Sequence, residues 1–396
     1  MSNERITFSI PCLMGLEKLV ADELKTLNMG NVRAENARVL CTGTLADIPR
    51  LNIRLRCGER VLIQLGHFPA QDFDQLYEGT RALPWEKFIP IDGAFPVRGH
   101  SLDSKLHSIP ACQSIVNKGV ATRLGSAYGL TTLPETGSRY QVQFNLMKDE
   151  AYLYLDTSGD ALYKRGYRAV GVEAPLRETL AAALVQLSHY RGRDPFCDPF
   201  CGSGTIAIEA ALIAKNRAPG LNRTFSAQKW KNVKSDLWLD AVDEALDLEY
   251  RNRTYEIWGG DIDPNAIEIA RSNSIKAEVE DTVSFEVSDA ARFHWGGEYG
   301  RIVTNPPYGE RLLDKQQAEA LYAEFGRAAD KLPDSWRLYI LSANQEFEHA
   351  FGRPAAKKRK LYNGMLRCDL YIYDRGIARQ KALAEEQFKG KPHRKK

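Results

Sequence analysis

Four consecutive residues in the C-terminal half combine a polar amide, two rigid residues and an aromatic ring: Asn305, Pro306, Pro307 and Tyr308. They follow a short apolar run at 302–304, so we expect them where a buried strand ends and a loop begins. The two prolines fix φ and remove two backbone donors, which makes the loop stiff. Such a loop could hold a planar amine between the Asn305 side-chain oxygen and the Pro306 carbonyl, with Tyr308 stacked on the ring. A structural turn is the alternative, because prolines are common where loops begin.

A second segment has the composition of a nucleoside-binding turn. Residues 198–205 read Asp-Pro-Phe-Cys-Gly-Ser-Gly-Thr and lead into an apolar helix expected at 206–214. Glycines admit close backbone approach and a helix amino terminus supplies donors, as in Rossmann-like sheets. The third glycine of the dinucleotide fingerprint and the lysine of a phosphate loop are missing. A carboxylate at the start of the turn favours an amino acid moiety with an ammonium group over a pyrophosphate.

Two more predicted strands end in acidic residues. Residues 255–264 place Asp261 where it could accept both ribose hydroxyls, whereas helix capping explains Asp263 better than binding does. Residues 283–290 carry Asp289, which could take an adenine amino group, although an acid after a strand is common. Three such strand ends, followed in order by the proline-rich loop, predict a nucleoside-binding α/β sheet with a reaction site at its edge.

The N-terminal half has none of the residues expected of a catalytic site. Strands are expected at 6–10, 38–41, 60–65, 94–99, 140–146 and 150–156, and helices at 16–27 and 111–124, with 51–55 as a further helical candidate. The stretch from about 67 to 110 is rich in proline, glycine and aromatic residues. His100 and His107 have no ligand partners at metal-binding spacing, so a loop or partner-contact role is favoured.

Composition sets the outer limits. The 396 residues are too many for one ordinary core, so two or three domains are expected, and the net charge of +3 does not by itself indicate a polyanion partner. Seven cysteines, an odd number without a signal peptide, predict reduced thiols in a cytoplasmic protein. Apolar runs fall short of the roughly 20 residues of a membrane span, so we expect a soluble protein. Cys197 and Cys201 are half of a zinc-site spacing without a second pair, so no metal is expected.

Basic residues occur in four places where RNA could bind. At the junction of the two halves, residues 162–168 interleave basic residues with tyrosines, which can stack on bases. A pair of basic residues on the helix at 111–124 could bind phosphate, although a solvated face is the alternative. Residues 357–360 are all basic, and the solvated and RNA-contacting interpretations are equally supported there. The basic tail, 375–396, is expected to be disordered. The predicted RNA-binding residues are Lys164, Arg165, Tyr167, Arg168, Lys118 and Arg123.

These motifs resemble the amino-directed class of S-adenosylmethionine-dependent methyltransferases. Residues 163–168, 174–182 and 218–223 extend the resemblance to the family that carries a THUMP RNA-binding domain, most closely to the 23S ribosomal RNA guanine-N2 methyltransferases. The resemblance assigns catalysis to 305–308. It implies S-adenosylmethionine as cofactor, with these binding residues: Asp198, Pro199, Cys201, Gly202, Ser203, Gly204, Thr205, Asp261, Asp263, Asp289, Ala290, Glu178 and Thr179.

The expected fold is α/β, with a Rossmann-like, seven-stranded methyltransferase domain preceded by an α+β ferredoxin-like and THUMP region. The expected boundaries are 1–60 for the ferredoxin-like segment, 61–161 for THUMP, 162–174 for a linker, 175–378 for the methyltransferase domain and 379–396 for the tail. A fifth strand at 336–342 is followed by a hairpin of 357–361 and 365–373, joined through Asn363 and Gly364.

The expected reaction is methyl transfer to an exocyclic amine of an RNA base, and the resemblance alone points to guanine N2. Acceptors at Asn305 and Pro306 would align the amine, so no strong base is required. The same loop leaves open tRNA guanine-N2, DNA adenine-N6 and protein glutamine methylation. A silent fold serving as an RNA-binding assembly factor is the non-enzymatic alternative. Cytosine C5 chemistry is disfavoured, because the loop has no cysteine nucleophile.

Overall fold

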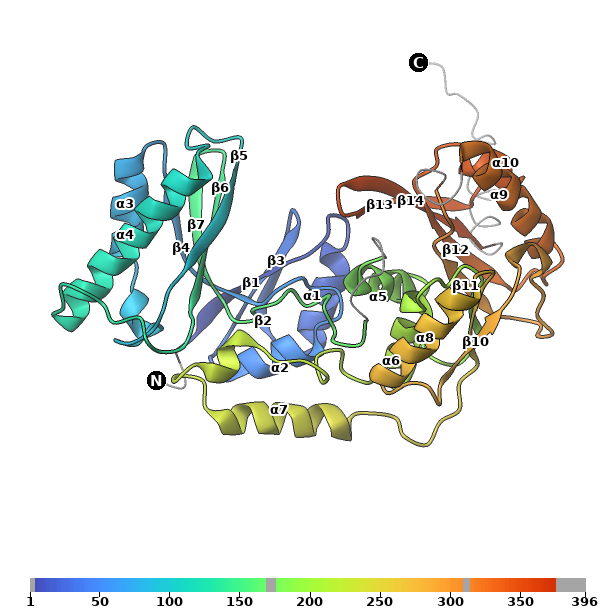
Figure 1. The fold of residues 1–396 in the computed structure, drawn as a ribbon, viewed down its shortest axis with the longest axis horizontal. Helices are drawn as coiled ribbons and strands as arrows, with labels where there is room; N and C mark the ends of the chain where they lie inside the picture. Colours follow the sequence, from blue (N-terminus) through green and yellow to red (C-terminus); the bar gives the residue numbers. More distant parts are fainter. Residues whose placement is uncertain (1–3, 169–175, 309–313, 375–396) are drawn as a thin grey trace, which may run out of the picture. The chain divides into compact units, whose positions relative to one another are not determined.

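The computed structural model describes residues 4–168, 176–308 and 314–374. The predicted tail at 379–396 and the part of the predicted linker from 169 to 174 lie outside these residues. The chain forms two compact units, each with a seven-stranded sheet (Figure 1). The first unit contains Met1–Lys164 and Ala218–Asp247, and the second contains Arg165–Arg217 and Leu248–Lys396. Within the described ranges, no helix has the length and apolar character needed to cross a membrane.

The first sheet has the order β2-β3-β1-β4-β7-β6-β5, and all its neighbours are antiparallel except β5 and β6. Helices α3 and α4 pack together beside β4 to β7 (Figure 1). Helix α3 falls in the stretch rich in proline, glycine and aromatic residues, where no helix was predicted; the side chain of Asp72 caps it by accepting from Gln75 N at 2.8 Å. The elements are β1 Ile6–Pro11, α1 Glu17–Thr26, β2 Gly30–Glu35, β3 Arg38–Gly43, α2 Asp47–Arg54, β4 Leu62–Pro69, α3 Phe73–Ala82, β5 Val97–Leu102, α4 Ile109–Tyr128, β6 Gln141–Met147 and β7 Glu150–Asp156.

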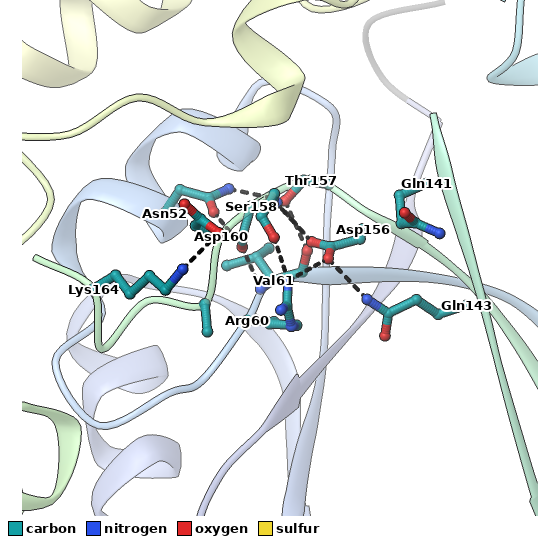
Figure 2. A network of polar contacts seen from close by, with 12 residues as sticks. Asn52, Arg60, Val61, Gln141, Gln143, Asp156, Thr157, Ser158, Asp160 and Lys164 are labelled. Carbon is teal, nitrogen blue, oxygen red and sulfur yellow. Dashed lines mark hydrogen bonds and ion pairs between the residues drawn. The ribbon is translucent and has the colours of Figure 1, made fainter. Parts of the chain in front are cut away.

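A buried polar network joins α2 and the start of β4 to the end of β7 (Figure 2). Asn52 donates to Thr157 Oγ1 at 2.9 Å and accepts from Ser158 Oγ at 2.6 Å. Arg60 pairs with Asp156 at 2.5 Å. Burial raises the pKa of Asp156, and the charge of Arg60 opposes that rise. Since buried polar groups are costly unless they are paired, these bonds hold the two halves of the sheet in one arrangement.

Residues 218–247 belong to the first unit although they lie within the segment 175–378. Their helix α7, Ser235–Asp247, packs against α2, where Glu244 pairs with Arg50 at 3.1 Å. Gly220 N donates to Ile53 O at 2.9 Å, and a Cβ at this glycine would lie 2.7 Å from Ile53 Cα. Part of the segment predicted as one methyltransferase domain is therefore built into the N-terminal unit.

The second sheet has the order β10-β9-β8-β11-β12-β14-β13. Strands β10 to β12 are parallel and β14 is antiparallel to both neighbours, which confirms the predicted seven-stranded, mostly parallel sheet. The strand order reverses between β8 and β11, the point at which open α/β sheets bind ligands. The elements are α5 Glu178–Leu187, β8 Phe196–Asp198, α6 Thr205–Ala214, β9 Ile257–Asp261, α8 Pro264–Lys276, β10 Val283–Val287, β11 Arg301–Thr304, α9 Lys315–Ala329, β12 Arg337–Ser342, α10 Phe347–Phe351, β13 Lys357–Asn363 and β14 Leu366–Tyr373.

The final hairpin is confirmed, but its turn lies one residue later than predicted. Asn363 pairs with Leu366, so the two turn residues are Gly364 and Met365 rather than Asn363 and Gly364. Gly364 has φ +64°, and a positive φ at the first central position suits the two-residue turns that match strand twist. The glycine therefore decides where the chain reverses, and Met365 becomes a turn residue instead of the first residue of a strand.

Candidate active site

The predicted acidic residues lie at one edge of the second sheet. Asp198 ends β8, Asp261 ends β9 and Asp289 follows β10 by two residues, and these three strands are parallel neighbours. Parallel strands bring their carboxyl ends to the same edge, so the three acids are brought together. Asp261 also holds the glycine-rich turn, because its Oδ2 accepts from Gly202 N at 2.9 Å.

The turn itself needs two glycines for different reasons. Gly202 and Gly204 have φ of +50° and +82°, values that side-chain-bearing residues rarely adopt. A Cβ at Gly204 would lie 2.8 Å from the Phe285 ring, so this position is also crowded. A Cβ at Gly202 would meet no atom within 4 Å, so the turn faces open space there. Helix α6 begins at Thr205, and its first N–H groups are available to an incoming ligand.

Asp198 is tied to the residue that precedes the proline-rich loop. Thr304 Oγ1 donates to Asp198 Oδ1 at 2.6 Å, across the point where the strand order reverses. Both residues are buried, and burial raises the pKa of Asp198 to about 7 while the Thr304 hydrogen bond opposes the rise. In the ranges that the structure describes, no lysine, arginine or histidine forms an ion pair with Asp198. A ligand cation at this position would therefore be stabilised by an otherwise unneutralised carboxyl group.

The proline-rich loop is fixed from two sides. Tyr322 Oη, on α9, donates to Pro307 O, and Cys368 Sγ, on β14, lies 3.8 Å from Tyr308 Oη. Tyr308 Oη in turn donates to Asn305 Oδ1, the oxygen that was predicted to accept a target amine. Burial raises the pKa of Tyr308 well above its usual value, so this hydroxyl stays protonated and remains a donor. A target amine would have to replace the Tyr308 hydroxyl at Asn305.

Glu178 and Thr179 start helix α5 and are both buried. Arg168 Nε lies 3.5 Å from Glu178 Oε1, and its guanidinium also donates to Thr205 Oγ1 at 2.9 Å. Burial raises the pKa of Glu178 to about 7, and the Arg168 charge opposes the rise. Glu178 Oε2 has no hydrogen-bond partner among the residues described. Arg168 thus links the start of α5 to the start of α6, beside an unsatisfied carboxylate oxygen.

Three domain families match the chain in sequence. The family described as "RMKL-like, methyltransferase domain" matches residues 165–372, the RlmL ferredoxin-like domain matches 7–62, and the THUMP domain matches 70–156. The chain is also 43% identical to "Putative RNA methyltransferase YpsC" of Bacillus subtilis, over 94% of this chain and 97% of that protein. The chain belongs to the RMKL-like methyltransferase family. The pattern-level resemblance of the N-terminal region to ferredoxin-like and THUMP sequences is confirmed by the same matches.

Proteins similar to this chain have names that differ in the substrate they state. Ribosomal RNA large subunit methyltransferase K/L of Psychromonas ingrahamii is 34% identical over 93% of this chain, which spans half the length of that relative. The crystal structure of "SMU.472, a putative methyltransferase complexed with SAH" has a TM-score of 0.89 and 38% identity, covering 94% of this chain and 98% of that one. A Listeria monocytogenes structure titled "predicted N6-adenine-specific DNA methylase" also has a TM-score of 0.89, at 43% identity over 93% and 96%.

Two of the predicted RNA-binding residues need correction in this RMKL-like fold. Arg165 and Tyr167 are each only 2% exposed, and both contact Glu209 on α6, at 3.4 Å and 3.1 Å respectively. They are not accessible to an RNA ligand in this structure. Both side chains contact Oε1 of the buried Glu209, so pairing within the protein accounts for the basic and aromatic pattern.

Lys164, Lys118 and Arg123 lie at or near the surface, and their RNA contacts stay predictions. Lys164 pairs with Asp160 at 3.1 Å. Arg123 pairs with Glu86 at 2.5 Å, so its charge is partly neutralised. Lys118 lies on the same helix, α4, with its ammonium 5.3 Å from the centroid of the Tyr77 ring. Helix α4 therefore presents one lysine without a carboxylate partner of its own among the ion pairs of the described residues.

The remaining predicted cofactor residues have identifiable structural contacts. Asp263 caps α8 by accepting from Asn265 N at 2.9 Å, in agreement with the favoured interpretation. Asp289 caps the short turn that begins at Ala290 by accepting from Ala291 N at 2.9 Å. In the turn after β8, Pro199 and Cys201 flank Phe200, and Ser203 O accepts from Asn273 at 3.0 Å.

Several residues at this edge of the sheet were not predicted from the sequence. Ile262 is 71% exposed and lies between Asp261, which ends β9, and Asp263. The sequence did carry a signal for Ile262, because an apolar residue flanked by two acids at a strand end is expected to be exposed, and exposed apolar residues can mark a ligand site. No local sequence pattern indicated the roles of Thr304, Tyr322 and Cys368. Each contacts a residue that is distant in the chain or lies on another strand.

Proposed function

We propose that this protein transfers a methyl group from S-adenosylmethionine to an exocyclic amine of an RNA base, with guanine N2 in ribosomal RNA as the acceptor. The observation that carries the proposal is the position of Asn305, directly after β11 and next to the strand that ends in Asp198. The THUMP match and the names of the RNA-methylating relatives support RNA as substrate. Ribosomal RNA as acceptor implies a cytoplasmic location.

The residues present fit this cofactor. S-adenosylmethionine supplies a methyl group on a sulfonium cation and also carries an ammonium group. Asp198 and Glu178 offer buried carboxyl groups whose pKa values burial raises to about 7, and a bound cation would stabilise their ionised forms. The open face of Gly202 can accept a ligand at close range, and Asp261 is the proposed ribose partner. Exposed Ile262 would pack on the adenine ring, with Asp289 at the adenine amino group.

The loop residues would act by aligning the amine. The Asn305 side-chain oxygen and the Pro306 carbonyl accept the two N–H groups, and Tyr308 stacks on the base once its hydroxyl has left Asn305. Because Tyr322 holds Pro307, the loop can keep its geometry when that exchange occurs. Positioning of the amine contributes most of the rate acceleration in this mechanism, so no residue is assigned as a general base.

Asn305→Ala tests this assignment. We expect the variant to bind S-adenosylmethionine with unchanged affinity by calorimetry and to lose turnover by at least a hundredfold, because it lacks the acceptor that aligns the amine. Asn305→Asp, which keeps an acceptor oxygen, is the matched control and should retain more activity. Undiminished turnover of Asn305→Ala would refute the role.

DNA adenine-N6 methylation is a second candidate function. The Listeria monocytogenes relative is described as a predicted N6-adenine-specific DNA methylase, and the loop would hold an adenine amine equally well. Labelled S-adenosylmethionine incubated in parallel with RNA, DNA and protein separates the candidates. Label in DNA alone would replace the RNA proposal, and label in protein alone would favour glutamine methylation.

A further inference from the structure

The hairpin β13–β14 presents a completely exposed apolar side chain at its tip. Met365 is 99% exposed and lies in the two-residue turn with Gly364. The pair Asn363 and Leu366 closes the strand pairing immediately beside it, so the backbone at the tip is held firmly. A single exposed apolar residue is ordinary on a protein surface. What distinguishes Met365 is where it lies.

The tip is close to the proposed catalytic loop. Cys368, three residues after Met365, places its thiol 3.8 Å from Tyr308 Oη. Three residues of extended strand span about 10 Å, which sets the distance along the hairpin from the tip to this contact. Burial raises the pKa of Tyr308, and a hydrogen bond from Asn363 opposes the rise, so the strand on the other side of the turn also reaches Tyr308.

The strand that leads to the tip carries four consecutive cations. Lys357, Lys358 and Lys360 are exposed and Arg359 is half-buried. Lys358 forms an ion pair with Glu348. Such a row attracts a phosphate backbone, and the attraction carries no sequence preference. The hairpin therefore combines phosphate attraction along its length with an apolar side chain at its end.

We propose that the hairpin β13–β14 opens the RNA at the target base, with Met365 inserted into the base stack as an apolar wedge. This rests on the proposed function, because a stacked base must be extruded before its amine can reach Asn305. Extrusion breaks the stacking and pairing of the target base, and proteins insert apolar side chains between base steps to unstack them. Methionine suits the task, since its unbranched side chain adapts to the gap that the base leaves.

The test compares one variant on two forms of one substrate. The modified nucleotide is first mapped in 23S ribosomal RNA methylated by the wild-type protein. Two stem-loops that contain it are then made, one with the target base paired and one with it opposite an abasic site. For Met365→Ala we expect kcat/KM to fall at least tenfold on the paired stem-loop and less than threefold on the other, since an unpaired base is easier to extrude.

Two further variants make the comparison specific. Met365→Leu keeps an apolar wedge and should stay within threefold of the wild type on both stem-loops. Ile275→Ala removes an exposed apolar side chain, 59% exposed, from α8 and should change neither. Equal losses for Met365→Ala on both stem-loops, or no loss on either, would overturn the wedge. A wild-type protein that methylates no RNA would instead refute the proposed function, and the wedge with it.

Discussion

Replacing Thr304 by valine removes one donor from a buried carboxyl group while nearly preserving side-chain shape. Thr304 Oγ1 lies 2.6 Å from Asp198 Oδ1, whereas Phe200 N lies 3.3 Å from the same oxygen. The threonine hydroxyl is therefore the stronger partner. Because burial raises the pKa of Asp198 to about 7, the group is mostly ionised at pH 8.5 and mostly protonated at pH 5.5.

The expected loss of stability depends on which form of Asp198 is present. A hydrogen bond to an ionised group contributes about 1.5–3 kcal/mol and one between neutral groups about 0.5–1.5 kcal/mol. We expect Thr304→Val to lower the free energy of unfolding by about 2 kcal/mol at pH 8.5 and about 1 kcal/mol at pH 5.5.

The direction of the pH dependence follows from linkage. The pKa of Asp198 is higher in the folded than in the unfolded protein, so the folded state binds the extra proton. The stabilisation from this proton is fully present below the unfolded pKa and is lost as the pH rises through about 7. The pKa of Glu178 is also raised to about 7. Its effect on the pH dependence of the free energy of unfolding is the same in the wild type and in Thr304→Val, so it cancels when the two are compared.

Urea denaturation without added cofactor, followed by circular dichroism at both pH values, measures this difference. Thr304→Ser keeps the hydroxyl and should show little pH dependence in its effect. In an Asp198→Asn background, the effect of Thr304→Val should become independent of pH. A destabilisation that is equal at the two pH values, or larger at pH 5.5, would refute the assignment of the Asp198 carboxylate as the partner that matters.

Two further predictions concern the loop and the first unit. Tyr308→Phe removes the hydroxyl that binds Asn305, so the KM for RNA should be unchanged or lower. Tyr308→Ala loses stacking of about 1–3 kcal/mol and should raise the KM by roughly 5- to 150-fold. A tenfold higher KM for Tyr308→Phe would contradict the exchange at Asn305. Gly220→Ala would place a Cβ 2.7 Å from Ile53 Cα and should cost about 1–3 kcal/mol in urea denaturation. Gly296→Ala, where a Cβ meets no atom within 4 Å, is its control, and equal stability of the two variants would show that the close approach is unimportant.

The elements of the second sheet could be predicted because their signals are local. A short apolar run, a glycine turn or a strand-end acid can be recognised within about ten residues, and the order of such signals specifies a parallel sheet. The hairpin was predicted for the same reason, although its turn was one residue off. Helix α3 was not predicted; it is capped by Asp72 and packs on α4, and that packing has no signal in the local sequence.

The sequence by itself determined the class of sheet, the family resemblance and the order of the residues along the proposed site. Only the tertiary structure decided the environments of those residues. Arg165 and Tyr167 contact Glu209, which is 44 and 42 residues away, respectively. An exposed linker could have the same local pattern of basic and aromatic residues. Likewise, residues 218–247 join the first unit because α2 covers α7. Burial and pairing between distant residues depend on the whole folded chain, so no local pattern can specify them.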